Sequence, residues 1–329
     1  MGLDPGYRTG CKMAIIDAQG NVLDYGAYYL TNSEKLKQEA QKKLAEKIRK
    51  FNVTLLSIGN GTASYETEQF ASKMIEEEKL DCHYIITNEA GASVYSASKL
   101  AIDELPDLDV TIRGAVSIAR RVQDPLAESV KIDPKSIGVG QYQHDVNQKQ
   151  LTHTLDQVVE SVVNHVGVEL NTASPAILQH IAGISGTVAK NIVAFRQENG
   201  GFTSRKQLLK VPRLGPAAFT QCAGFLRLNG AKNPLDNTSV HPESYELAER
   251  IIGELGFTLK DLQDKSQLEA LQVKLPLVDV DKMAHKLDAG VPTVRDIIAA
   301  LAKPGRDPRE DLPAPLTRKH VVSLEDIKV

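Results

Sequence analysis

Carboxylate side chains stand at or near the ends of several expected strands, where neighbouring strands can bring acids together. Asp4 ends a short first strand and precedes a Pro-Gly turn, Glu89 lies in TNEAG, and Asp145 lies in YQHD. Hydrolysis of a phosphodiester through two divalent cations requires hard oxygen ligands gathered from separate elements. Asp4, Glu89 and Asp145 are therefore candidate catalytic residues and metal ligands, with Mg²⁺ as the possible cation.

Each of these acids also has an ordinary structural interpretation as a turn or capping residue. Glu66, which follows GNGTAS, suits the first turn of a helix. Two-metal chemistry needs enough carboxylates to hold both ions and to orient water, and only three are well placed. We therefore expect a non-catalytic scaffold that requires no cofactor, and a Mg²⁺-dependent nuclease is the alternative.

Two glycine-bearing turns form an internal repeat at a spacing of thirty residues, and each opens a helix. Residues 181–189 read IAGISGTVA and residues 211–219 read VPRLGPAAF. Glycine lets the backbone approach a phosphate closely, and the N–H groups and dipole at a helix N-terminus favour an anion. We expect one phosphate to be held by Gly183, Gly186 and the amides of Thr187 and Val188. A second would be held by Gly215 and the amides of Ala217 and Ala218. The alternative is a pair of ordinary helical hairpins whose glycines are C-caps.

Positive charge gathers around this repeat. Residues 171–230 carry seven Lys and Arg side chains against one acidic side chain, a net charge of +6, whereas the whole chain has a net charge of −3. Such an uneven distribution is typical of one module that meets a polyanion. The cations nearest the turns are Lys190, Lys206, Lys210 and Arg213.

Composition sets the protein class. A chain of 329 residues is long enough for two or three domains, and 42% of its residues are hydrophobic. It has no apolar stretch long enough to span a membrane and only three cysteines, without a CxxC pair. We expect no secretory leader. We expect a cytoplasmic protein that is a monomer and does not bind membranes.

Hydrophobic periodicity places these motifs on an α/β domain over residues 1–146. We expect strands ending at Asp4 and over 11–17, 21–30, 53–58 and 83–87, and helices over 34–51, 64–79, 91–102 and 112–129, followed by a loop over 132–140. Alternation of strands and helices in the second half of this domain predicts parallel strand pairing there.

The rest of the chain is expected to be helical. A connecting segment over 147–170 contains a long helix, residues 171–230 form two helix–turn–helix units, and residues 231–303 form a small, mostly helical domain. Four prolines between residues 304 and 315 indicate a linker over 304–329.

A dinucleotide-binding domain is a further alternative. The sequence GNGTAS after strand 53–58, with Asp81 downstream, partly matches a dinucleotide fingerprint. The third glycine is missing, and the motif follows a hairpin and a helix instead of opening the first βαβ unit. We therefore disfavour this interpretation.

The order of elements resembles the ribonuclease H-like fold in its YqgF, RuvC-like branch. The repeat resembles the tandem helix-hairpin-helix, a sequence-independent binder of DNA or RNA backbone, although Ser185 and Arg213 replace two of its glycines. The sequences GLDPGYRTGCK, GNGTASYETE, TNEAGASVYSAS, GVGQYQHDVNQ and HPESYELAERI are closely similar to the Tex family of bacterial RNA-binding transcription accessory proteins.

This resemblance implies an α/β ribonuclease H-like (YqgF) domain, then an all-α tandem helix-hairpin-helix and a further small, mostly helical domain. It implies a nucleic-acid-binding protein that acts with the transcription machinery. Asp4, Glu89 and Asp145 would occupy the nuclease-like positions. The family also has an N-terminal helical region and a C-terminal S1 domain, so we expect a central fragment whose residues 304–329 lead towards the S1 domain.

Overall fold

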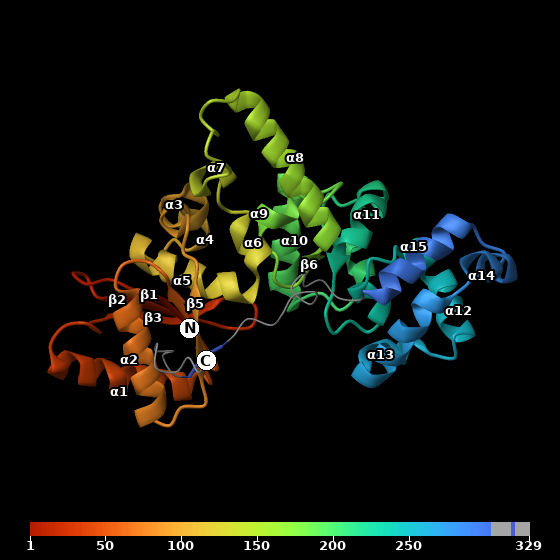
Figure 1. Ribbon diagram of the computed structural model, residues 1–329. Coiled ribbons are helices and arrows are strands. Elements are labelled where there is room, and N and C mark those ends of the chain that lie inside the picture. Colours follow the sequence, from red (N-terminus) through yellow and green to blue (C-terminus); the bar gives the residue numbers. More distant parts are fainter. Residues whose placement is uncertain (304–316, 320–329) are drawn as a thin grey trace. The chain divides into compact units, whose positions relative to one another are not determined.

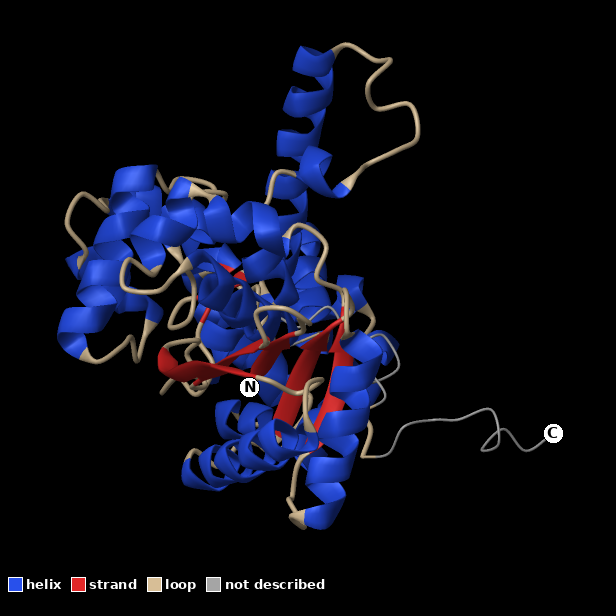
Figure 2. Cartoon of the chain, turned by 90° about the vertical axis from the view of Figure 1, so that its left-hand side faces the viewer, coloured by secondary structure: helices blue, strands red, loops and turns tan. Residues whose placement is uncertain are grey.

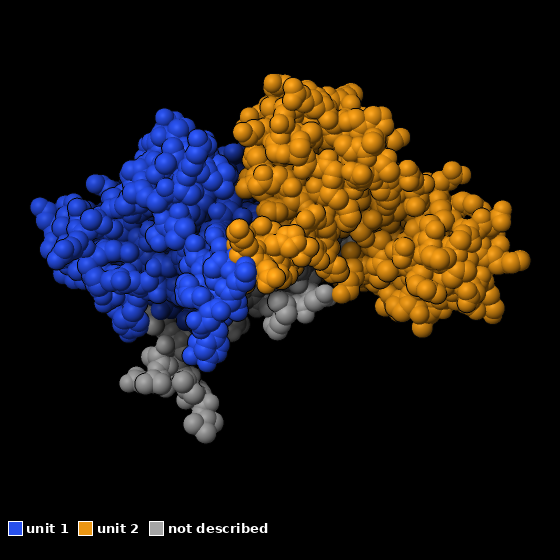
Figure 3. All heavy atoms as spheres, turned by 90° about the horizontal axis from the view of Figure 1, so that it is seen from above, with its two compact units in different colours: residues 1–148, 313–329 blue, residues 149–312 orange. Residues whose placement is uncertain are grey.

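The computed structural model describes residues 1–303 and 317–319. It divides into two compact units, residues 1–148 with 313–329 and residues 149–312 (Figure 3). Each unit has its own arrangement of helices and strands, and each is considered separately below.

The first unit contains a mixed sheet, whose strands are red in Figure 2. The sheet has five strands in the order β3-β2-β1-β4-β5. Its strands are β1 (Gly2–Asp4), β2 (Cys11–Ile16), β3 (Val22–Tyr28), β4 (Leu55–Gly59) and β5 (His83–Thr87). β2 pairs antiparallel with β1 and β3, and β4 pairs parallel with β1 and β5. The expected hairpin and the expected parallel pairing are both confirmed.

Helices cover both faces of this sheet (Figure 1). α1 (Glu34–Lys50) and α2 (Ser64–Glu77) bury Leu44 and Met74 in one core with alternate strand residues, including Met13 and Ile15 of β2. Ala14, between those two residues, belongs to a second core against α5 (Val110–Gln123). Because successive residues of a strand point to opposite faces, β2 contributes side chains to the cores on both faces of the sheet.

α5 approaches β1 closely because glycine stands at the contact. A Cβ atom built on Gly2 would lie 2.2 Å from the carbonyl oxygen of Ala115, a separation that atoms do not reach without movement. The absence of a side chain at Gly2 therefore lets the helix pack directly on the short first strand.

Two of the expected helices are broken, and this corrects the sequence-based prediction. The segment expected as helix 91–102 forms α3 (Ala92–Ala97) and α4 (Lys99–Glu104), and 112–129 forms α5 and α6 (Pro125–Ser129). Ser98 has an extended backbone and its hydroxyl accepts from the Ala101 amide, which starts α4. Asp124 caps α6 in the same way, with proline at the first helical position. The loop expected at 132–140 contains the single turn α7 (Pro134–Ile137).

The described residues of the second unit, 149–303, form helices and one pair of short strands. It begins with α8 (Gln148–Val166) and continues through β6 (Val168–Glu169), α9 (Pro175–Leu178), α10 (Gly186–Asn199), the 3₁₀ helix η1 (Arg205–Lys210), α11 (Pro216–Cys222), η2 (Ala223–Phe225) and β7 (Leu226–Arg227). β6 and β7 pair parallel to each other. The turns between α9 and α10 and between η1 and α11 are the two copies of the repeat.

The remaining helices pack around a separate apolar cluster that includes Ile251, Leu271, Val294 and Leu301. They are η3 (Pro234–Asn237), η4 (Pro242–Ser244), α12 (Tyr245–Glu254), η5 (Leu259–Gln263), α13 (Lys265–Lys274), η6 (Leu275–Leu277), α14 (Val280–Leu287) and α15 (Val291–Ala302). Within the described ranges, the helices are too short or too polar to cross a membrane. The expected linker over 304–329 lies outside the described residues except at 317–319.

Candidate nucleic-acid interface

The two turns of the repeat have the same backbone conformation. Gly183 and Arg213 occupy equivalent positions, and both are left-handed, with φ of 80° and 65°. Ser185 and Gly215, two residues later, are extended and cap α10 and α11. The departures from the glycine pattern at Arg213 and Ser185 therefore leave both turns intact.

The two copies also contact each other reciprocally. Asn191 of α10 donates a hydrogen bond of 2.8 Å to the carbonyl oxygen of Pro212 in the second turn. Gln221 of α11, thirty residues after Asn191, lies over the first turn. A Cβ atom built on Gly183 would be 2.8 Å from the Gln221 Cβ. Each turn is thus held by the second helix of the other copy.

The amides at the two helix starts differ in availability. In the first copy the Ser185 hydroxyl accepts from the Val188 amide at 3.3 Å, so this predicted phosphate ligand already has a partner. The helical bonding of α10 begins with Ala189 donating to Ser185, which leaves the amides of Gly186 and Thr187 ahead of it. In the second copy Gly215 offers no side-chain cap to the amides of Ala217 and Ala218.

The seven cationic side chains of residues 171–230 separate into two groups. Lys190, Lys206, Lys210 and Arg213, the four selected from the sequence, are all exposed. None of the ion pairs found between described residues involves them. The other three, Arg196, Arg205 and Arg227, turn inward and donate to backbone carbonyl groups.

Arg205 is the most buried of these, with 1% of its surface exposed. Its guanidinium donates to the carbonyl oxygens of Leu226 at 2.8 Å, Leu235 at 3.2 Å, Val240 at 2.8 Å and Thr238, and to the Tyr245 hydroxyl at 2.8 Å. The Asp236 carboxylate accepts from that hydroxyl and from the Arg205 amide. This side chain joins the second hairpin to residues 226–245 and is unavailable to a ligand.

Arg196 and Arg227 are used similarly. Arg196 donates to the carbonyl oxygens of Leu170 at 3.0 Å and Ala173 at 2.8 Å, and burial lowers its pKa. Arg227 donates to the carbonyl oxygen of Thr238 at 3.0 Å. The exposed charged side chains of residues 171–230 are therefore four cations and Glu198. Their net charge is smaller than the +6 counted from the sequence. Sequence reasoning missed this because most of the carbonyl partners lie more than ten residues away.

Two of the three predicted carboxylates meet at the ends of parallel strands in the first unit. Asp4 ends β1 and Glu89 follows β5 by two residues. The Glu89 carboxylate lies in a cradle of glycines, since a Cβ atom on Gly59 would be 2.3 Å from its Oε2 and one on Gly61 would be 1.8 Å from its Oε1. A Cβ on Gly114 of α5 would lie 2.9 Å from Asp4 Oδ2.

The electrostatics of this pair are unfavourable for two negative charges. Burial, followed by the neighbouring Glu89 carboxylate, raises the pKa of Asp4 to about 6, although Lys12 opposes the shift. Glu89 Oε2 is buried and makes no hydrogen bond to another described residue. A shared proton or one hard cation would relieve both features.

Asp145 does not join them. It lies on an exposed turn before α8, where its amide donates to the Tyr142 carbonyl oxygen at 3.0 Å. Among the residues that the structure places, no three His, Cys, Asp or Glu side chains come together as a metal site. The expected three-carboxylate cluster is therefore not assembled here. Glu66 sits in the first turn of α2, as its ordinary interpretation predicts, and accepts from the Tyr7 hydroxyl at 2.7 Å.

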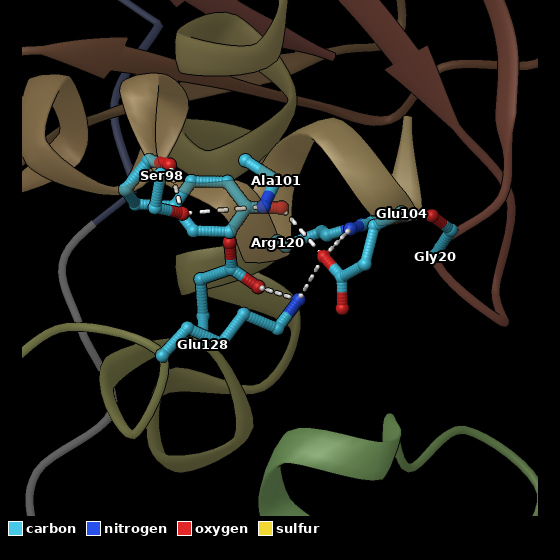
Figure 4. A network of polar contacts seen from close by, with 8 residues as sticks. Gly20, Ser98, Ala101, Glu104, Arg120 and Glu128 are labelled. Atoms are coloured by element: carbon cyan, nitrogen blue, oxygen red, sulfur yellow. Dashed lines mark hydrogen bonds and ion pairs between the residues drawn. The ribbon is translucent and has the colours of Figure 1, made fainter. Parts of the chain in front are cut away.

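A network of charged side chains supports the turn that carries Glu89. Glu104 of α4 accepts from the Tyr95 hydroxyl at 2.6 Å and from Lys131 at 3.1 Å, and Lys131 also pairs with Glu128 of α6 at 3.0 Å (Figure 4). Arg120 of α5 reaches Glu104 at 3.6 Å. The network fixes α3, which starts directly after the Glu89 turn, against α4, α5 and α6.

Three regions of the chain match known protein families. Residues 1–123 match the family profile described as Tex protein YqgF-like domain, residues 163–227 match a helix-hairpin-helix motif, and residues 233–309 match an HHH domain. The chain belongs to the Tex family. The family profiles agree with the resemblance that the sequence motifs indicated.

Several relatives of this Tex family chain are similar over its full length. It is 53% identical to protein YhgF of Escherichia coli over 330 residues, and 49% identical to the transcriptional accessory protein Tex of Neisseria gonorrhoeae over 330 residues. It is 40% identical to the human S1 RNA-binding domain-containing protein 1 over 385 residues. Each alignment covers 100% of this chain but only 41%, 42% and 38% of the respective relative. The chain thus spans about two fifths of the length of these relatives.

Proposed function

We propose that this Tex family chain binds the phosphate backbone of nucleic acid through its two hairpins, without sequence preference. The observation that carries the proposal is the separation of the cations in residues 171–230. The three arginines that stabilise the fold are turned inward, and the four cations near the turns are exposed and form no ion pair with another described residue. Backbone phosphates are recognised by such side chains together with amides at helix starts.

The two turns supply complementary ligands in this proposal. Gly186 and Thr187 offer amides in the first copy, and Ala217 and Ala218 offer amides in the second. Lys190 lies one turn into α10, and Arg213 lies in the turn before α11. Contacts of this type position a protein on the duplex or strand but carry no base information, so binding is expected to be sequence-independent.

The test replaces Lys190 and Arg213 together by Glu and measures binding to labelled duplex DNA and single-stranded RNA by fluorescence anisotropy. The matched control replaces Lys260 and Lys265, two exposed lysines in η5 and at the start of α13, by Glu and changes the net charge equally. The proposal expects most binding to be lost in the first variant and retained in the control. Equal affinities of the two variants would contradict it.

We further propose that the α/β domain is a scaffold and not a nuclease. The pair formed by Asp4 and Glu89 can hold one cation, whereas two-metal hydrolysis needs further ligands for a second ion and for water. The test is incubation of a Holliday junction, a duplex and an RNA with Mg²⁺ or Mn²⁺, beside an Asp4→Asn variant. Cleavage by the wild-type chain that disappears in the variant would make the nuclease interpretation correct.

The cellular setting is also a proposal. The Neisseria gonorrhoeae relative is called a transcriptional accessory protein, and we propose that this chain likewise acts beside the transcription machinery in the cytoplasm, as a monomer. Cys11, Cys82 and Cys222 are buried and form no disulfide, as suits a reducing compartment. Co-purification with RNA polymerase, compared with the Lys190→Glu and Arg213→Glu double variant, tests whether that association depends on nucleic acid.

A further inference from the structure

The outer edge of β5 is occupied by a distant segment of the same chain. Tyr84 and Arg318 pair antiparallel, and each donates its amide to the carbonyl oxygen of the other at 2.8 Å. On the inner side of the strand, the amide of His83 donates to the Thr54 carbonyl oxygen at 3.0 Å. β5 is an edge strand in the sheet order, so Arg318 extends the sheet beyond it.

Side chains of α2 recognise the added segment. Arg318 donates to Glu68 Oε1 at 3.3 Å, and the same oxygen accepts from the Tyr84 hydroxyl at 2.9 Å. Ser72, one turn further along α2, donates from its hydroxyl to the Lys319 carbonyl oxygen at 2.9 Å. The segment is therefore held by its main chain at two residues and by its arginine side chain.

The receiving groups are built into the first unit. Glu68 is 9% exposed and Tyr84 is fully buried, so the Glu68 carboxylate is withdrawn from water. Among the ion pairs between described residues, the cation that pairs with the Glu68 carboxylate is Arg318. A buried carboxylate without a cation is costly, and an open strand edge presents unpaired amide and carbonyl groups. The Glu68 carboxylate and the main-chain groups of Tyr84 are both satisfied by one segment that carries an arginine at the pairing position.

We infer that the outer edge of β5, together with Glu68 and Ser72 of α2, is a strand-docking site that selects an arginine-bearing extended segment, and that residues 317–319 are its occupant. Strand addition of this kind obtains affinity from main-chain hydrogen bonds and specificity from a side-chain pocket. Here the pocket is the Glu68 carboxylate. The site serves no part of the nucleic-acid contact proposed above, and it ties the segment that follows the helical domains to the edge of the α/β sheet.

The test is amide hydrogen exchange in the full chain carrying Arg318→Glu, which places a carboxylate beside Glu68. The Tyr84 amide should exchange about tenfold faster because its acceptor departs, while the His83 amide stays protected. The matched control is Lys319→Glu, which makes the same charge change at the next residue and leaves the docking arginine in place. Unchanged exchange at Tyr84 in Arg318→Glu, or equal acceleration in Lys319→Glu, would overturn the inference.

A second set of variants tests the pocket without introducing a repelling charge. Arg318→Ala and Glu68→Gln are compared singly and together by the exchange rate of the Tyr84 amide. If the two side chains act through each other, the double variant exchanges no faster than the faster single variant. If the acceleration of exchange in the double variant is instead the product of the two single accelerations, Glu68 does not select the arginine and the pocket is refuted.

Discussion

Gly183 and Arg213 occupy the same position of the two hairpin turns, thirty residues apart, and both have a left-handed backbone, with φ of 80° and 65°. Glycine adopts this conformation without strain, whereas a residue with a Cβ atom does so at a cost of about 1 kcal/mol or more. Arg213 is exposed, so packing of its side chain does not offset that cost. Its presence at this position is accounted for if the guanidinium contacts a phosphate.

Arg213→Gly should therefore raise stability and lower affinity together. We expect the second unit to gain about 1 kcal/mol against chemical denaturation, because the strain is relieved, and binding to nucleic acid to weaken several-fold. Asp288→Gly is the matched control, since Asp288 is also exposed and left-handed, with φ of 51°, but lies at the end of α14. It should raise stability without changing affinity. Loss of stability in Arg213→Gly, or unchanged affinity, would contradict the role assigned to the side chain.

The neighbouring cations Arg205 and Lys206 should have different roles: removal of Arg205 should lower stability, and removal of Lys206 should lower affinity for nucleic acid. Arg205→Leu leaves the buried carbonyl oxygens of Leu226, Leu235, Thr238 and Val240 without their guanidinium donor, and should destabilise the second unit by about 3–5 kcal/mol. Lys206→Leu removes an exposed charge and should change stability by about 0.5 kcal/mol or less. Under conditions in which both are folded, only Lys206→Leu should weaken binding. Urea denaturation and anisotropy titrations measure the two effects, and a similar loss of stability in both variants would refute the separation.

The carboxylate pair gives a pH dependence of defined sign. Because the pKa of Asp4 is raised from 3.8 to about 6 in the folded chain, the folded state holds a proton that the unfolded state releases between these values. The contribution of Asp4 to stability is therefore present at pH 4 and is lost as pH rises through about 6. Asp4→Asn should be more stable than the wild-type chain at pH 8, by up to about 3 kcal/mol, and equally stable below pH 4.

The measurement is thermal or urea unfolding at pH 4 and pH 8, with the exposed Asp107→Asn variant as the control for removal of an acid. Added Mg²⁺ at pH 8 should stabilise the wild-type chain and leave Asp4→Asn unaffected if the pair holds a cation. A stability difference that is the same at both pH values would show that the pKa of Asp4 is not raised in the folded chain.

Local patterns predicted the strands of the first unit and several of its helices. Strand 83–87 has the bounds that its apolar run indicated, and the helix expected over 34–51 is α1. The breaks at Ser98 and Asp124 were not expected because apolar periodicity continues across them, although Pro125 was a signal for the second break. Capping at these positions outweighs the helical pattern.

The use of individual charges depended on contacts that the sequence does not reveal. Arg205 and Lys206 are neighbours of similar type, yet one is buried among carbonyl groups of residues 226–240 and the other is exposed. Likewise Asp4 and Glu89 meet because β1 and β5 flank β4 in parallel, whereas Asp145 lies on a turn whose position no strand fixes. Local spacing predicted the turns of the interface but overstated its charge.

The salt dependence of binding tests the central claim most directly, because its slope counts the phosphates that are neutralised. Four exposed cations predict a slope of log K against log salt no steeper than about −4 for duplex DNA, and a slope near zero when Lys190, Lys206, Lys210 and Arg213 are all replaced by Ala. A wild-type slope of about −6 or steeper would require the inward arginines or another surface to bind phosphate. A slope that is unchanged in the fourfold variant would show that the hairpins do not contact the backbone.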